Sequence, residues 1–300
     1  MPESNLLTHD DCQTTPNCCL LCTDLDRTLL PNGEQLESAN ARPYFRTLVS
    51  KAQLPLAYVS GRDLALVQQA INEYQLPLPD YAITDVGSMI YQRVGDDYQP
   101  LPEWIEHLRA LWQGIDAEAL AQELGSFKQL ELQASARQKP FKLSYQVTPA
   151  SALAAEVSEL QRRLELLPYA VNIVSSIDET QNEGLVDVLP ANAGKRAAID
   201  FLVAKLKLTT EQVFFSGDSG NDLDVLVSPY PAVVVRNALA DVVHQAMTLS
   251  KINGVDEQLW VAQGDESLSL NGNYSAGIVE GLLYFYPQLR SWLTVEQESR

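Results

Sequence analysis

The sequence of 300 residues predicts an α/β fold whose core is a doubly wound, mostly parallel sheet. Short apolar runs that indicate buried strands alternate with segments of helical periodicity. Such alternation is typical of a parallel sheet with helices on both faces. The apolar runs cover 18–22, 55–59, 81–84, 212–215 and 231–235, and the helical patterns between them include 64–74 and 195–206.

The middle of the chain departs from this alternation and indicates a second module. Between about residues 100 and 187, helical patterns are segregated from strand-like ones. The helical patterns cover 104–113, 117–124 and 151–166, and the strand-like ones cover 142–147 and 169–175. The borders are polar and contain glycine, as linkers do. We therefore expect a discontinuous core domain at 18–98 and 188–300, an inserted α+β cap domain at 99–187, and a flexible N-terminal extension at 1–17.

The net charge and the lengths of the apolar runs limit the classes of protein to which this chain is expected to belong. The chain carries 39 acidic and 21 basic residues, and its net charge of −18 argues against nucleic acid and anionic membranes as partners. No apolar run approaches the roughly 20 residues that a bilayer requires. The N-terminus lacks the basic and apolar regions of a signal peptide. We expect a cytoplasmic enzyme or binding protein with a small-molecule ligand.

The most informative segment is Asp24-Leu25-Asp26-Arg27-Thr28, which follows the first predicted strand. Residues two apart on a strand point to the same side, so Asp24 and Asp26 are expected to face one ligand. In open α/β sheets, ligands bind at the carboxyl ends of the strands. The two carboxylates are therefore predicted to belong to a functional site.

Three further segments fall at similar positions. Ser60-Gly61-Arg62 follows the second predicted strand, and Lys195 opens a predicted helix. Gly217-Asp218-Ser219-Gly220-Asn221-Asp222 follows another strand. Together the four segments fit phosphoryl transfer, which needs a nucleophile, a divalent cation and donors for the phosphate oxygens.

Each residue type suits one role in that chemistry. Asp24 is expected to be the nucleophile that forms an aspartyl-phosphate, and Asp26 the general acid and base. Hard oxygen atoms from Asp24, the Asp26 carbonyl and Asp218 suit Mg²⁺. Ser60 and Lys195 are expected to hold the phosphate, and Lys195 does so at the positive end of a helix dipole.

These motifs resemble those of the haloacid dehalogenase superfamily, in the branch with a large cap inserted between the second and third motifs (type IIB). More closely, the chain resembles the sucrose-phosphate phosphatase family. The matching stretches are 80–91, 142–145, 186–190, 217–223 and 235–238. The resemblance implies a Rossmann-like core and supports the roles given above. Arg27 departs from the pattern, because the superfamily often has glycine or asparagine at that position.

The resemblance also implies further site residues. Asp222 would orient Lys195 or a metal-bound water, which places it with Asp24, Asp26 and Asp218 in the predicted metal set. Gly61, Arg62, Lys142 and Asn221 are the predicted substrate-binding residues. In the cap, polar Lys142, Ser144 and Gln146 alternate with apolar residues, so one polar strand face is expected to cover the site and Lys142 to donate to sugar hydroxyls.

The expected function is Mg²⁺-dependent hydrolysis of a sugar phosphate, either sucrose 6-phosphate or a related mono- or disaccharide phosphate. One alternative is a sugar phosphomutase, which uses the same aspartyl chemistry but needs a bisphosphate activator. Another is a catalytically silent partner of a glycosyltransferase. The complete set of acidic residues and lysine argues against the silent partner. A sizeable cap favours a monomer, with association to a glycosyltransferase as a further expectation.

Overall fold

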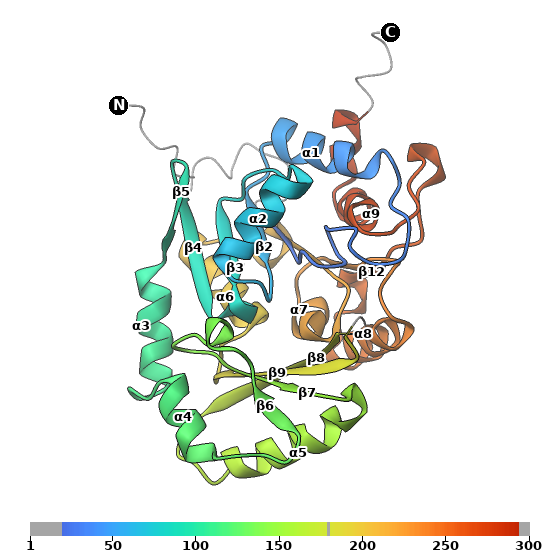
Figure 1. Cartoon of the computed structure of the whole chain (residues 1–300). Coiled ribbons are helices and arrows are strands. Elements are labelled where there is room, and N and C mark those ends of the chain that lie inside the picture. The colour runs from blue at the N-terminus through green and yellow to red at the C-terminus, as the bar shows by residue number, and fades with distance from the viewer. Residues whose placement is uncertain (1–19, 179–180, 294–300) are drawn as a thin grey trace.

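The structure is a computed structural model that describes residues 20–178 and 181–293 (Figure 1). Its larger sheet has the strand order β12-β11-β10-β1-β2-β3-β4-β5. Strands β12 to β3 in this order are parallel, and the hairpin β4-β5 continues the sheet in antiparallel fashion. The strands are β1 (Leu20–Thr23), β2 (Leu56–Val59), β3 (Tyr81–Thr84), β4 (Met89–Val94), β5 (Asp97–Pro100), β10 (Val213–Gly217), β11 (Ala232–Val234) and β12 (Leu259–Val261).

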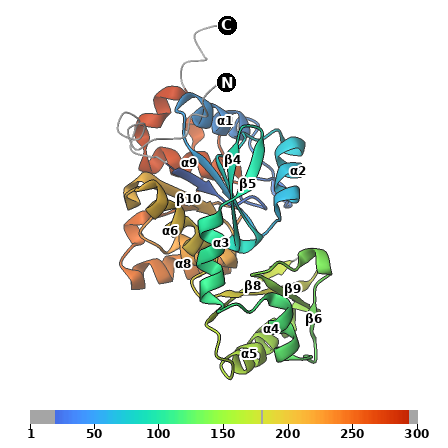
Figure 2. The same ribbon diagram turned by 90° about the vertical axis from the view of Figure 1, so that its left-hand side faces the viewer.

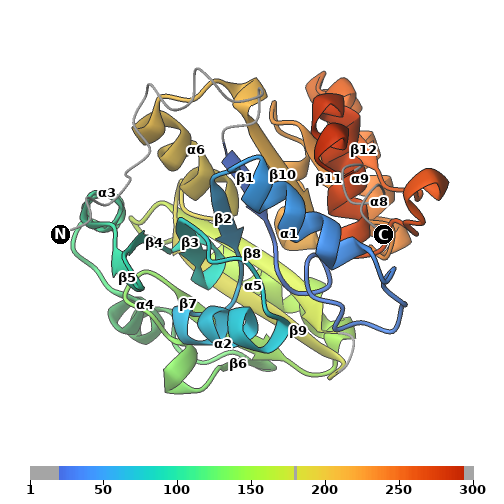
Figure 3. The same cartoon turned by 90° about the horizontal axis from the view of Figure 1, so that it is seen from above.

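Helices cover both faces of this sheet, because successive strand residues point to opposite sides. Leu21 and Phe214 pack with α1 (Ala41–Lys51), α2 (Leu64–Tyr74) and α9 (Ser275–Phe285). Leu20 and Phe215 pack on the opposite face, which is covered by α3 (Pro102–Leu111), α6 (Lys195–Leu206), α7 (Leu223–Leu226) and α8 (Ala240–Asn253). Figure 3 shows α1 and α2 on one side of the strands and α6 on the other.

A second, antiparallel sheet has the order β6-β7-β9-β8. It lies between the larger sheet and two outer helices, α4 and α5 (Figures 1 and 2). One of its faces is apolar and buried, as at Tyr145 and Val186, and it forms a core with the outer helices. The elements are β6 (Leu130–Leu132), β7 (Leu143–Val147), β8 (Val171–Asp178), β9 (Glu183–Pro190), α4 (Ala117–Leu124) and α5 (Leu153–Leu164).

The predicted fold class is confirmed, and helices α2, α4 and α6 begin and end at the predicted residues. The borders of the cap domain stay a prediction. In the structure, β5 belongs to the larger sheet up to Pro100, and β9 belongs to the smaller sheet up to Pro190. Helix α3 packs on the core through Trp104, whose ring lies 5.1 Å from that of Phe201 in α6. The predicted extension at 1–17 lies outside the described residues.

The two chain segments that lead into and out of the smaller sheet meet beside Gly87. The indole of Trp104 donates to the Gly87 carbonyl at 3.2 Å. Gly87 has φ +95°, and a Cβ atom there would lie 2.3 Å from the Gly194 carbonyl carbon. Only glycine allows this approach, which places the turn after β3 against the start of α6. No helix in the described ranges is long and apolar enough to cross a membrane.

Candidate active site

The predicted site residues meet at the carboxyl ends of neighbouring parallel strands. Asp24 follows β1, Ser60 follows β2 and Asp218 follows β10, and these three strands are adjacent in the sheet. The Asp24 amide donates to the Ser216 carbonyl at 2.9 Å, so hydrogen bonding continues beyond the end of the strand. Sheet topology therefore brings together segments that are almost two hundred residues apart in sequence.

Lys195 lies at the centre of the site. Its Nζ donates to Asp24 Oδ1 at 2.8 Å and to Asp222 Oδ1 at 2.7 Å. All three side chains are buried, with at most 7% of any of them exposed. Buried charges are tolerated only when they are paired and hydrogen-bonded, and this triad satisfies both conditions.

Burial and the attraction between opposite charges shift the pKa values of Asp24 and Lys195 in opposite directions. Burial raises the pKa of the Asp24 carboxyl well above its usual value; Lys195 opposes the rise, and Asp222 and Asp218 add to it. For Lys195, burial alone would lower the pKa. The carboxylates of Asp222 and Asp24 outweigh that effect and raise it. The ammonium group is therefore held in its charged form.

The turn after β10 holds Asp222 in place. The second carboxylate oxygen of Asp222 accepts the amides of Asp218 and Ser219, both at 3.1 Å. A Cβ atom on Gly217 would lie 2.6 Å from the Asp222 Cγ, so a side chain at this position would displace the carboxylate. The same turn contains η6 (Gly220–Asp222), and Asn221 accepts the Ser219 hydroxyl at 3.0 Å.

Three carboxylates at this site fit a divalent cation. Asp24, Asp218 and Asp222 each offer an oxygen, and the three atoms all lie within 4.8 Å of one another. A buried cluster of hard oxygen donors suits Mg²⁺. Asp218 Oδ1 also accepts the Thr28 hydroxyl at 3.1 Å, and Arg27 Nε lies 3.5 Å from Oδ2. Burial, reinforced by Asp222, raises the pKa of Asp218 to about 7.

The Asp26 side chain lies outside this carboxylate cluster. Arg62 donates to it twice, from Nε at 2.8 Å and from a terminal nitrogen at 2.6 Å, and Asn32 donates at 2.7 Å. This hydrogen bonding to Asp26 raises the pKa of the Arg62 guanidinium. In this structure Arg62, predicted to bind substrate, thus contacts the predicted acid and base. The spacing of Arg62 and Asp26 in the sequence did not predict this ion pair.

Ser60 is fully buried, and its hydroxyl accepts the Arg62 amide at 3.2 Å. Gly61 between them is open enough that an added Cβ would meet only Val86, at 3.8 Å. The loop therefore carries both the predicted phosphate ligand Ser60 and the side chain that holds Asp26.

Lys142 joins the smaller sheet to the core. Its Nζ lies 3.4 Å from Asp85 Oδ1, and both side chains are almost completely buried. Burial raises the pKa of Asp85, whereas Lys142 and Lys139 lower it. Asp85 had no predicted role, although it lies inside the matching stretch 80–91. Its backbone φ of 52° marks it as unusual only once the structure is known.

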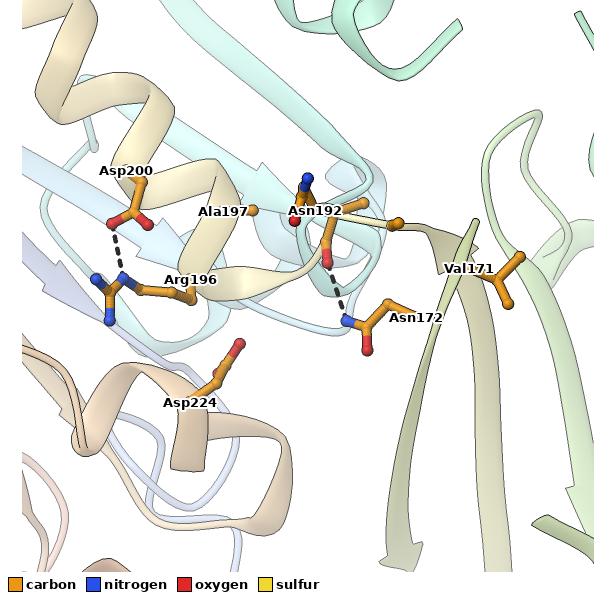
Figure 4. Close-up of a pocket in the computed structure, with 9 residues that line it drawn as sticks. Val171, Asn172, Asn192, Arg196, Ala197, Asp200 and Asp224 are labelled. Carbon is orange, nitrogen blue, oxygen red and sulfur yellow. Dashed lines mark hydrogen bonds and ion pairs between the residues drawn. The ribbon is translucent and has the colours of Figure 1, made fainter. Parts of the chain in front are cut away.

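A hollow of about 430 Å³ lies where β9 leads into α6 (Figure 4). Asn172 of β8 donates to the Ala193 carbonyl at 3.0 Å, and Arg196 pairs with Asp200 at 2.7 Å. Burial, reinforced by Asp222, raises the pKa of the nearby Asp224 to about 6. None of the four residues predicted to be catalytic lines this hollow, so we do not include it in the site.

Comparison with known proteins identifies the family. Residues 17–286 match the family described as Sucrose-6F-phosphate phosphohydrolase. The chain belongs to this family. A solved sucrose-phosphatase from Synechocystis sp. PCC6803, in complex with sucrose and phosphate, superposes with a TM-score of 0.72 at 26% identity. The match covers 90% of this chain and 98% of that one.

Sequence relatives agree with this assignment. A putative HAD-like hydrolase of Nitrosococcus oceani is 42% identical over 93% of this chain and 75% of its own length. A probable sucrose-phosphatase of Arabidopsis thaliana is 30% identical over 75% of this chain, and the match spans about half of that protein, 52%. The predicted family and the predicted enzyme class, a sugar-phosphate phosphatase, are thereby confirmed.

The charge balance around Lys195 leads to a test of stability. We expect Lys195→Met to lower the free energy of unfolding by about 3–5 kcal/mol, because it leaves two buried carboxylates without their cation. Urea denaturation would measure the change. Lys205→Met is the matched control, because Lys205 lies on the same helix in a surface ion pair with Glu103 and should cost less than about 1 kcal/mol. Equal losses in both variants would contradict this account of the triad.

Proposed function

We propose that this chain hydrolyses sucrose 6-phosphate or a related mono- or disaccharide phosphate, with Mg²⁺ as cofactor and an aspartyl-phosphate as intermediate. The observation that carries the proposal is the buried Asp24 carboxylate, held 2.8 Å from Lys195 beside two further carboxylates. Relatives support the substrate class: one solved relative is a sucrose-phosphatase, and another relative is a mannosylfructose-phosphate phosphatase of Agrobacterium fabrum, 28% identical over 76% of this chain.

The first step is attack by Asp24 on phosphorus. An Asp24 oxygen forms the new P–O bond while the bond to the sugar oxygen breaks, and Asp26 gives its proton to that departing oxygen. Lys195 holds Asp24 in position and offers positive charge near the phosphate oxygens. When bound at the carboxylate cluster, Mg²⁺ would supply further positive charge to the same oxygens.

The second step is hydrolysis of the intermediate. Asp26 takes a proton from the attacking water, the bond between Asp24 and phosphorus breaks, and phosphate leaves. Arg62 and Asn32 together engage both oxygens of Asp26, which suits the deprotonated state needed here. Protonation of the leaving group in the first step requires that at least one of these contacts opens.

The polar face of the smaller sheet is the proposed sugar site. Ser144 donates to Asp187 at 2.5 Å across neighbouring strands, on the face opposite the buried Tyr145 and Val186. This face turns away from α4 and α5, toward the core (Figure 2). Paired hydroxyl and carboxylate groups suit the hydroxyls of a sugar. Lys142 and Asn221 are proposed to complete the site from the cap and the core.

The nucleophile assignment predicts loss of activity in Asp24→Asn. Purified protein is incubated with Mg²⁺ and a panel of sugar phosphates, and phosphate release is measured. We expect release from at least one substrate, loss with EDTA, and a fall of at least about 1,000-fold in Asp24→Asn. Activity that appears only with an added sugar bisphosphate would favour a mutase. No release from any substrate by folded, metal-loaded protein would favour the silent partner.

The assignment of Asp26 predicts a dependence on the leaving group. For Asp26→Asn we expect kcat/KM to fall about 100- to 1,000-fold with a sugar phosphate, because an alkoxide leaving group needs a proton. The fall should be much smaller with p-nitrophenyl phosphate, whose leaving group needs none. Asp96→Asn, in the exposed β4–β5 turn, is the control. Equal falls for both substrates would remove Asp26 as the acid.

The assignment of Lys142 predicts a change in substrate binding. We expect Lys142→Ala to raise KM several-fold for the sugar phosphate and less for a small aryl phosphate, because only the sugar reaches the cap. Lys139→Ala is the control, since Lys139 also faces the core, 3.8 Å from Asp63, but is partly exposed. If KM rises equally for both substrates, Lys142 acts on the position of the cap and does not contact the sugar.

A further inference from the structure

Arg27 projects from a loop that is held tightly by two amide side chains. Its backbone φ is 59°, a left-handed conformation that most side chains avoid. The Arg27 amide donates to Asn32 Oδ1 at 2.8 Å, and its carbonyl accepts Asn237 Nδ2 at 2.6 Å. These bonds fix the direction in which the Arg27 side chain leaves the chain.

That direction leads to the carboxylate cluster. Arg27 Nε lies 3.5 Å from Asp218 Oδ2, and a terminal nitrogen donates to the Asn237 carbonyl at 3.4 Å. The other oxygen of Asp218 accepts the Thr28 hydroxyl at 3.1 Å. The loop that follows β1 therefore gives Asp218 one hydrogen bond, from Thr28, and one ion pair, with Arg27.

The charges in the cluster show what Arg27 contributes. Lys195 pairs with Asp24 and Asp222, whereas the cation beside the third carboxylate, Asp218, is Arg27. Without a metal ion, Arg27 offsets the repulsion among these carboxylates. Once a divalent cation binds Asp218, the guanidinium becomes a neighbour of like charge.

We propose that Arg27 is a positioning residue that holds Asp218 for the metal and, through its charge, lowers the affinity of the site for divalent cations. The inference rests on the proposed function, in which Asp218 is a metal ligand. With Arg27 the site would depend less on metal for its stability than a site with asparagine at this position. The metal would also dissociate from it more readily.

The test compares metal binding in Arg27→Asn and the natural protein. Asparagine tolerates the left-handed backbone and removes the charge. Calorimetric titration of metal-stripped full-length protein with Mg²⁺ and Mn²⁺, without substrate, should show binding about five- to tenfold tighter in Arg27→Asn. The Tm of the metal-free variant should be lower, and its rise on adding metal larger.

Two further variants separate the effect of the charge at position 27 on metal affinity from the effect of the net charge of the whole protein. Arg109→Asn removes the same net charge from the exposed surface of α3, where Arg109 pairs with Glu106, and should leave metal affinity unchanged. Arg27→Lys keeps the charge and should restore affinity to near the natural value.

Three results would overturn the inference. Metal affinity equal in Arg27→Asn and Arg109→Asn would show that Arg27 does not act on the metal site. Weaker binding in Arg27→Asn would reverse the proposed effect. Unchanged metal affinity together with weaker inhibition by inorganic phosphate would assign Arg27 to the phosphate. If the natural protein binds neither Mg²⁺ nor Mn²⁺, the metal site in the proposed function is wrong. If the natural protein binds metal but Arg27→Asn does not bind it more tightly, only the proposal about Arg27 is wrong.

Discussion

The ammonium group of Lys195 is the interaction on which the site depends. It joins the end of β1, the turn after β10 and the start of α6, three segments that the chain reaches at very different points. In a buried environment each carboxylate would be costly without this partner. The charge of Lys195 thus sets the relative positions of the nucleophile Asp24, the turn that carries Asp222 and the start of α6.

The local charge contrasts with that of the whole chain. A net charge of −18 repels a phosphate ester, yet four basic side chains gather around the site. Lys195 contacts two of the predicted catalytic or metal carboxylates, and Arg27 and Arg62 contact one each. Lys142 approaches from the cap toward Asp85. In this structure every one of these cations has an acidic partner. A phosphate would therefore compete with these carboxylates for the basic side chains, and its own negative charge would be repelled by the net charge of the chain.

Much of this arrangement follows from the sequence, because parallel strands present their carboxyl ends at one edge. That rule alone places Asp24, Ser60 and Asp218 together. The Arg62–Asp26 pair was not predictable, since the reach of a long side chain depends on tertiary geometry rather than spacing. The same holds for Lys142 and Asp85, because Lys142 immediately precedes β7 of the smaller sheet and Asp85 immediately follows β3 of the larger one. In helix α9 nearly all residues are buried, so no polar face marks its period.

The close approach of Gly87 to Gly194 has a consequence for engineering. Both connections between the two sheets pass this point, one through Trp104 and the other through the residues that open α6. A different cap taken from a relative could be joined to this core only if the junctions lie outside this contact. A graft that replaced Gly87 with a larger residue would press its Cβ atom against the Gly194 carbonyl and the Lys195 amide, and would push Lys195 away from Asp24. Substrate range could then be exchanged only at the expense of the catalytic centre.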